Sequence, residues 1–251
     1  MTTDANPYKG IKNYLDREPR ELCEPGHALS YSPAITGTAR FITGLAVAEI
    51  IISPKSLENY ASAGPAVVVP DHRSKFDLTA MGTLGNRGGE GQPWFLSKRE
   101  NMEQRTMAFL YGKMRTFPMD RDMIDPRWRT MLMKMGKHIL GSDEEEGQQA
   151  SKLVIFGEGG RKEGAMVKEM MPGSLILAKK NDVPIIPVGI AGTDQRRIRD
   201  GRLTIVIEVG EPYEVGRIKD TDLLRDRVQE MKDSARRKLY LPNSMNAATN
   251  F

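Results

Sequence analysis

The 251-residue sequence has one cysteine, three histidines and few aromatic residues. Cys23 cannot form an internal disulfide, and no cluster of cysteines and histidines offers a structural zinc site. Aromatic residues make up 6% of the chain, which is too few for a surface that binds single-stranded nucleic acid by base stacking. No zinc-finger or RNA-recognition signature is present. Chemistry that needs a histidine must therefore use His27, His72 or His138.

The overall composition is that of a globular protein with a mildly basic surface. Hydrophobic residues make up 39% and charged residues 28%, and the formal net charge is +4. This balance argues against disorder, and the length suffices to bury a sizeable core. The sequence pI of about 9.1 indicates an anionic partner, for which membrane phosphates and phosphorylated small molecules are the best candidates.

The N-terminal region contains the most apolar stretch of the chain. The first residues are polar and include acids, which is not the pattern of a secretory signal, so a cytosolic setting is expected. Residues Ala34–Ile52 would form a helix about 28 Å long, which nearly spans a bilayer. Because Arg40 and Glu49 would then lie in hydrocarbon, we predict a helix that lies on a membrane surface or packs on the domain.

From residue 55 onward, short apolar runs alternate with helical patterns. We predict strands at 66–70, 94–97, 116–120, 152–156, 183–190 and 203–210. We predict helices at 55–62, 76–84, 98–111, 125–140, 173–180 and 221–241. The alternation predicts an α/β domain with a central, mostly parallel or mixed sheet flanked by helices. The expected organisation is an N-terminal arm and apolar helix over 1–62, the α/β domain over 63–241 and a tail over 242–251.

The strand at 66–70 leads directly into a histidine and an aspartate that could act together. His72 comes just after the strand end, and Asp77 lies five residues on, in the first turn of the next helix. A turn between them can bring the carboxylate to one imidazole nitrogen and leave the other nitrogen to take a proton from a hydroxyl. The alternative is a helix cap beside a surface histidine.

A glycine-rich segment, Phe156-Gly-Glu-Gly-Gly-Arg161, follows the strand at 152–156. Its glycines allow a close approach of the backbone to a ligand, and Arg161 offers a two-pronged guanidinium for phosphate. Glu158 could accept a hydrogen bond from a ligand hydroxyl or brace the loop. The alternative is a glycine-rich turn with a surface ion pair.

Two further segments have the same kind of position. Arg121 ends the segment Phe117-Pro-Met-Asp-Arg121 and is a second phosphate candidate, or else a solvated surface charge. The segment from Val183 to Val188 holds two prolines around an apolar pair, which indicates a buried strand with a structural role.

These four segments, in this order and at these spacings, resemble the motifs of the glycerolipid acyltransferase family, which includes the 1-acyl-sn-glycerol-3-phosphate (lysophosphatidic acid) acyltransferases. The resemblance covers roughly residues 60 to 210. The positions that match the family's motifs are His72, Ser74 and Asp77 in the first, Phe117 to Arg121 in the second, and Phe156, Glu158, Gly159 and Arg161 in the third. Lys98 matches a lysine that opens the helix before the second motif, whereas Gly157 and Gly160 replace a proline and a threonine in the third.

The resemblance implies an O-acyltransferase that moves a fatty acyl group from acyl-CoA or acyl carrier protein to lysophosphatidic acid, giving phosphatidic acid. His72 would be the general base and Asp77 its orienting partner. The residues implied in substrate binding are Arg121, Glu158, Gly159, Arg161, Ser74 and Lys98. No metal and no cofactor beyond the thioester co-substrate are expected.

The same resemblance implies a peripheral or monotopic protein at the cytoplasmic face of the cell membrane, where it meets its lipid partner. Two alternatives stay open. The acceptor could be glycerol 3-phosphate, another lysolipid or a glycolipid. The chain could also be a non-catalytic phospholipid-binding protein, although the presence of both His72 and Asp77 speaks against that.

Overall fold

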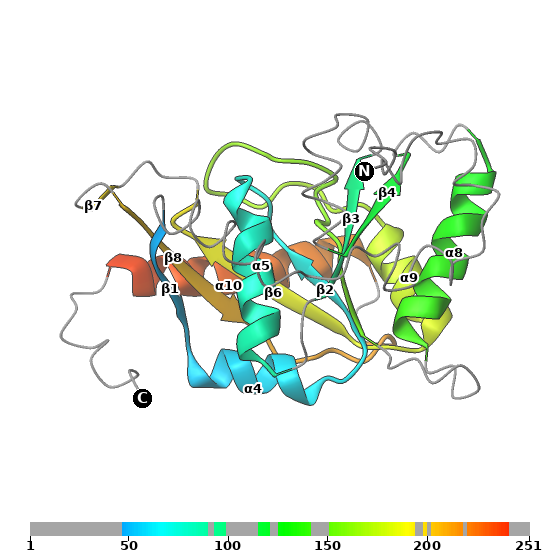
Figure 1. The fold of residues 1–251 in the computed structure, drawn as a ribbon, viewed down its shortest axis with the longest axis horizontal. Helices are drawn as coiled ribbons and strands as arrows, with labels where there is room; N and C mark the ends of the chain where they lie inside the picture. The colour runs from blue at the N-terminus through cyan, green and yellow to red at the C-terminus, as the bar shows by residue number, and fades with distance from the viewer. Residues whose placement is uncertain are drawn as a thin grey trace, which may run out of the picture.

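The computed structural model describes residues 47–89, 93–98, 115–120, 125–141, 151–193, 198–199, 202–217 and 220–240. Within these residues, eight strands form one sheet in the order β1-β8-β6-β2-β5-β3-β4, with the short β7 beside β8 (Figure 1). The strands are β1 (Val47–Ile52), β2 (Ala66–Pro70), β3 (Trp94–Lys98), β4 (Thr116–Met119), β5 (Lys152–Val154), β6 (Ile185–Ala191), β7 (Ile198–Arg199) and β8 (Arg202–Val209). The helices are α4 (Pro54–Ser62), α5 (Phe76–Arg87), α8 (Arg127–Leu140), α9 (Gly173–Asn181) and α10 (Thr221–Tyr240).

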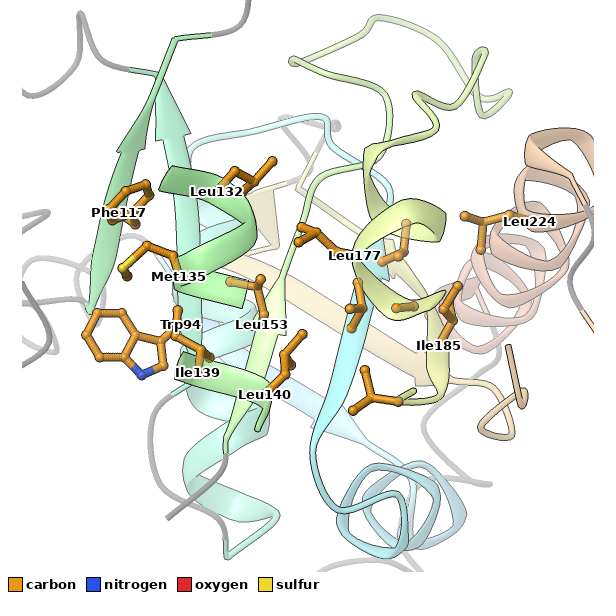
Figure 2. Packing of buried hydrophobic residues seen from close by; sticks show 14 of the residues in the cluster. Trp94, Phe117, Leu132, Met135, Ile139, Leu140, Leu153, Leu177, Ile185 and Leu224 are labelled. Atoms are coloured by element: carbon orange, nitrogen blue, oxygen red, sulfur yellow. The ribbon is translucent and has the colours of Figure 1, made fainter. Parts of the chain in front are cut away.

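Helices cover both faces of the sheet, because the central strand β2 is apolar on both sides. Its side chains alternate between the two faces, as in any strand. Val67 and Val69 belong to a core cluster with α8, α9 and α10, part of which Figure 2 shows. Ala66 and Val68 belong to a second cluster with α4 and α5. The predicted α/β fold with a mixed sheet flanked by helices is therefore confirmed.

Five neighbouring strands end at the same edge of the sheet. β2 pairs in parallel with both β5 and β6, and β3 pairs in parallel with both β5 and β4. The direction reverses at β8, which is antiparallel to β6, and again between β8 and the short β7. Loops that follow parallel strands meet at the carboxyl edge, where α/β proteins place their sites. The loops after β2 and β5 both leave from this edge.

The predicted helix over Ala34–Ile52 is wrong in its C-terminal part. Residues Val47–Ile52 form β1, which pairs in parallel with β8. Three consecutive isoleucines end this segment, and β-branched side chains favour a strand over a helix. β1 and α4, which precede the predicted domain boundary at residue 63, contribute Ile52 and Tyr60 to a core cluster that they share with the sheet. Residues 34–46 lie outside the described part of the chain.

Most other predicted elements are present with small shifts at their ends. The helix predicted from Asp125 begins at Arg127 as α8, with Pro126 at the N-cap position, and Asp125 Oδ1 accepts a hydrogen bond of 3.0 Å from the Arg127 N–H just before it. β4 lies at the edge of the sheet, as its Pro118 predicts. The helix predicted over 98–111 and the tail over 242–251 fall on residues that are not described, apart from Lys98, which ends β3. None of the described helices is both long and apolar enough to cross a bilayer.

A buried lysine of the sheet, packed against α4, makes the stability of the fold depend on pH in the alkaline range. Lys152 of β5 is 2% exposed, and its Nζ lies 4.7 Å from the centroid of the Tyr60 ring. Burial lowers the pKa of Lys152 from 10.5 to about 8 and raises the pKa of Tyr60 above its ordinary value of 10.0. Between pH 8 and 10 the unfolded chain therefore binds the Lys152 proton more strongly than the native protein does.

We expect the free energy of unfolding to rise by about 1–3 kcal/mol between pH 8 and pH 10. Above pH 10 it should fall again, because the unfolded state then loses the Tyr60 proton first. Urea unfolding at several pH values would measure this. Lys152→Met should abolish the rise, and Lys179→Met, on the exposed side of α9, should keep it. An unchanged pH dependence in Lys152→Met would contradict the assignment.

Candidate active site

His72 and Asp77 form a hydrogen-bonded pair at the carboxyl edge of the sheet. His72 follows β2, and Asp77 lies in the first turn of α5. The His72 Nδ1 is 2.8 Å from Asp77 Oδ2, with the His72 side chain 13% exposed and that of Asp77 1% exposed. An ionised carboxylate only accepts hydrogen bonds, so the bonded nitrogen must carry the proton. The other ring nitrogen, Nε2, is then the basic one.

The backbone of the turn holds Asp77 in place. Its Oδ2 also accepts hydrogen bonds from the N–H groups of Arg73 and Ser74, both at 2.7 Å. Ser74 Oγ accepts from the Phe76 N–H at 3.3 Å and so helps to start α5. Ser74 thus has a hydrogen-bonding role inside the loop, and its predicted role in substrate binding stays a prediction. The four residues between His72 and Asp77 form a turn that is long enough to bring the carboxylate back to the imidazole.

The loop after β5 packs directly on His72 and orients it. The imidazole stacks on the Phe156 ring, with centroids 4.1 Å apart and an interplanar angle of 27°. The Lys162 N–H donates to the His72 carbonyl oxygen at 2.9 Å. The His72 N–H donates to Glu158 Oε1 at 3.3 Å. Two segments that the sequence predicted separately therefore form one site.

A buried ion pair between Arg73 and Glu158 joins the two loops, and sequence reasoning missed it. Arg73 Nη1 donates to Glu158 Oε1 at 2.7 Å and to Oε2 at 2.9 Å, and the two side chains are 1% and 0% exposed. Arg73 also donates to the carbonyl oxygens of His72 and Met166. The Lys168 N–H donates to Glu158 Oε2 at 3.1 Å. Of the two roles considered for Glu158, these contacts are those of a loop brace, whereas its predicted contact with substrate stays a prediction.

Asp71, the residue before His72, is the third buried carboxylate near the site, after Asp77 and Glu158. Its Oδ1 accepts a hydrogen bond of 2.8 Å from the Ile190 N–H. Its Oδ2 lies 2.9 Å from Lys232 Nζ and 3.7 Å from Arg73 Nε. Burial raises the pKa of Asp71 to about 6, and the nearby Lys232 opposes that rise. The sequence offered no signal for Lys232, which lies far along the chain in α10.

The glycine that replaces the family's proline is explained by a methionine. A Cβ at Gly157 would overlap Met170 Sδ and would lie 2.9 Å from Val69 Cγ1. No side chain fits at this position while Met170 fills the space behind the loop. Gly159, predicted to bind substrate, lies in the turn that follows, where its N–H donates to the Phe156 carbonyl oxygen at 3.0 Å.

Of the remaining predicted residues, Arg161 and Lys98 are described and lie at the same edge. Arg161 is exposed and directly precedes Lys162, whose backbone bonds to His72. Lys98 is exposed at the end of β3, which is separated from β2 by β5. Arg121 lies outside the described residues, two positions after the end of β4. Of the other histidines, His138 is in α8 and His27 lies outside the described residues.

Comparison with known proteins gives a matching family model and a similar solved structure. A family model described as Acyltransferase matches residues 52–191, which is more than half of the chain. Among solved structures, the chain is similar to the 1-acyl-sn-glycerophosphate (LPA) acyltransferase PlsC from Thermotoga maritima, with a TM-score of 0.54 and 18% sequence identity. The similarity covers 77% of this chain and 73% of that one. A search of curated proteins gave no significant match.

Proposed function

Because the chain belongs to the Acyltransferase family, we propose that it moves a fatty acyl group from a thioester to the free hydroxyl of a lysophosphatidic acid. The observation that carries this proposal is the 2.8 Å contact between His72 Nδ1 and Asp77 Oδ2, which leaves Nε2 as a base. A hydroxyl is a poor nucleophile at neutral pH, and imidazole is the side chain whose ordinary pKa suits its activation.

In the proposed reaction, His72 takes one proton from the acceptor hydroxyl and then passes it to the leaving sulfur. Nε2 of His72 takes the proton of the acceptor hydroxyl while its oxygen attacks the thioester carbonyl carbon. Collapse of the tetrahedral intermediate breaks the carbon–sulfur bond and leaves a thiolate. The imidazolium returns its proton to that sulfur, so the products are an ester and a free thiol. Asp77 stabilises the imidazolium between these steps without itself taking the proton.

The phosphate of the acceptor is the second part of the proposal. Arg161 is the exposed arginine among the described residues of the loop that packs on His72, and Arg121 and Lys98 are the further candidates. A guanidinium can hold a phosphate by two parallel hydrogen bonds. The similarity to a solved LPA acyltransferase supports the choice of a lysophosphatidic acid. Because both substrates carry fatty chains, we also propose that the enzyme works on the cytoplasmic face of a membrane.

An acceptor panel tests the proposed function. Glycerol 3-phosphate, lysophosphatidic acid, lysophosphatidylcholine and a mannosylated lipid would each be offered with one acyl-CoA, and then with the acyl carrier protein donor. We expect free thiol and the mass of phosphatidic acid with lysophosphatidic acid. If a different acceptor gives the product, that acceptor would be assigned as the substrate in place of lysophosphatidic acid. Lipid binding without release of thiol under any condition would favour the non-catalytic alternative.

A conservative change at Arg161 tests its proposed contact with the phosphate. Arg161→Lys keeps the charge but loses the planar fork, and each lost charge-assisted bond costs on the order of 1.5–3 kcal/mol. We therefore expect the KM for the acceptor to rise about 10- to 150-fold, with little change for the acyl donor. Arg217→Lys, on the exposed loop after β8, is the control. An equal rise in both KM values would assign Arg161 to the donor or to the fold.

A further inference from the structure

Helix α10 reaches the site from outside the segment that the family model matches, which ends at residue 191. It contacts both loops that form the site. Gln229 Oε1 accepts a hydrogen bond of 2.6 Å from the Val167 N–H, in the stretch between β5 and α9. Lys232 reaches Asp71, the residue between β2 and His72. Figure 1 shows α10 running behind the sheet, beneath β6 and β8.

A glycine in β6 allows this contact. A Cβ at Gly189 would overlap the backbone of Met231 and Lys232, so only glycine lets α10 lie this close to the sheet. Because β6 is paired with β2, the close contact of α10 with β6 brings the Lys232 side chain to the residue that follows β2. Lys232 is 0% exposed, and its ammonium group can therefore not be satisfied by bulk water.

The buried charges around Lys232 form a chain that ends at His72. Lys232 Nζ lies 2.9 Å from Asp71 Oδ2, and Arg73 Nε lies 3.7 Å from the same oxygen. The other end of the Arg73 guanidinium holds both oxygens of Glu158 and the His72 carbonyl oxygen. Two buried cations thus serve two buried carboxylates, and Arg73 stands between the carboxylates.

We propose that Lys232 is a positioning residue for the His72–Asp77 pair, because its pairing with Asp71 leaves Arg73 to hold Glu158 and the His72 backbone. This inference rests on the proposed function of the pair as a catalytic base. Without Lys232, an ionised Asp71 competes with Glu158 for the one remaining cation. Any movement of Arg73 toward Asp71 shifts the His72 carbonyl oxygen and the Glu158 carboxylate, and with them the imidazole.

The test compares two lysines of the same helix. Lys232→Met should lower kcat roughly 10- to 100-fold at pH 8.5, as expected for a small misplacement of catalytic groups, with both KM values nearly unchanged. Removing Lys232 removes the group that lowers the pKa of Asp71, so the loss relative to wild type should shrink as the pH falls and Asp71 takes up a proton and stops competing. The other titratable groups facing Asp71 are Arg73 and Asp77. Lys238→Met, which breaks a 2.6 Å pair with Glu208 of β8, is the control and should keep full kcat.

A second variant separates charge pairing from packing. Asp71→Asn combined with Lys232→Met leaves no buried charge without a partner and should recover most of the lost kcat. If Lys232→Met does not fold, Asp71→Asn serves as the single variant that tests the inference. In Asp71→Asn, Lys232 faces Arg73 with no anion between them. This variant should be impaired and should improve when Lys232→Met is added. A folded Lys232→Met protein with kcat within threefold of wild type at pH 8.5 would overturn the inference, as would a double variant no better than the singles.

A readout without substrate keeps this test independent of the proposed reaction. Nitrogen-15 NMR of the histidine rings, with the His72 signals assigned from His72→Ala, reports which ring nitrogen carries the proton. Wild type and Lys238→Met should show the Nδ1–H form that the Asp77 contact requires. Lys232→Met should show a mixture of the two neutral forms, and the double variant should return to Nδ1–H. An inactive wild type would refute the proposed function, whereas an unchanged ring state in Lys232→Met would refute the positioning role.

Discussion

His72→Ala should lower kcat for acyl transfer by roughly 10²–10⁴-fold, the range expected when a general base is lost. Among the described residues, His72 is the histidine at a strand end with a carboxylate bonded to its ring, at 2.8 Å from Asp77. The KM values should change little, because the imidazole acts on the hydroxyl and does not carry the main binding contacts. Product formation in detergent–lipid micelles would measure both constants. Activity within about tenfold of wild type in a folded His72→Ala protein would end the proposed mechanism.

Two further variants show whether the pair acts as a unit. Asp77→Asn should also be severely impaired, since an amide can favour the wrong ring tautomer and cannot stabilise the imidazolium. The double variant should be little worse than His72→Ala, because the effects of residues that act together do not multiply. His138→Ala, in α8, is the matched histidine control and should retain activity. If the loss of kcat in the double variant equals the product of the two single losses, Asp77 has a separate role in shaping the loop.

Glu158→Ala should destabilise the fold by about 3–5 kcal/mol, because it leaves the buried Arg73 guanidinium without its main partner. The bidentate contact, at 2.7 and 2.9 Å between side chains that are 1% and 0% exposed, is shielded from water. The urea midpoint and slope would give the change in the free energy of unfolding. Replacing both residues, by Arg73→Met and Glu158→Met, should restore much of that stability.

A surface pair provides the comparison for this prediction. Arg225 on α10 bonds Asp222 and Asp226 at the exposed side of the helix. Arg225→Met should leave the urea midpoint unchanged, because exposed ion pairs contribute little to stability. A loss in Glu158→Ala no larger than that in Arg225→Met would mean that Arg73 finds water or another acceptor inside the loop.

The sequence predicts the elements of this fold better than their arrangement. The strand at 66–70 is an unbroken valine run that ends at a proline, and it is observed as β2. The segment Val47–Ile52 misled because an apolar run has no period that separates a helix from a buried strand. What decided its state was pairing with β8, more than 150 positions along the chain, and no local pattern reports such a partner.

The site shows the same division between local and long-range features. The His72–Asp77 contact was predictable because one turn connects the two residues. The Arg73–Glu158 pair was not, since the residues are 85 positions apart and Arg73 reads like an ordinary surface cation. Lys232 was less predictable still, because its burial depends on the missing side chain at Gly189. Motifs identify the candidate reacting groups, whereas the side chains that hold these groups in place come from the packing of distant segments.

The close packing of α10 against Gly189 determines when the site can be completed during protein synthesis. Every strand of the sheet and both loops of the site leave the ribosome before Thr221–Tyr240 does. Until that helix docks, Asp71 has no lysine beside it and Val167 has no acceptor from Gln229. Domains generally fold as units during synthesis, so the proposed active site cannot be complete before residues Thr221–Tyr240 have left the ribosome. With the roles proposed above, full activity would require α10, and a nascent chain that stops at residue 220 would lack both Gln229 and Lys232.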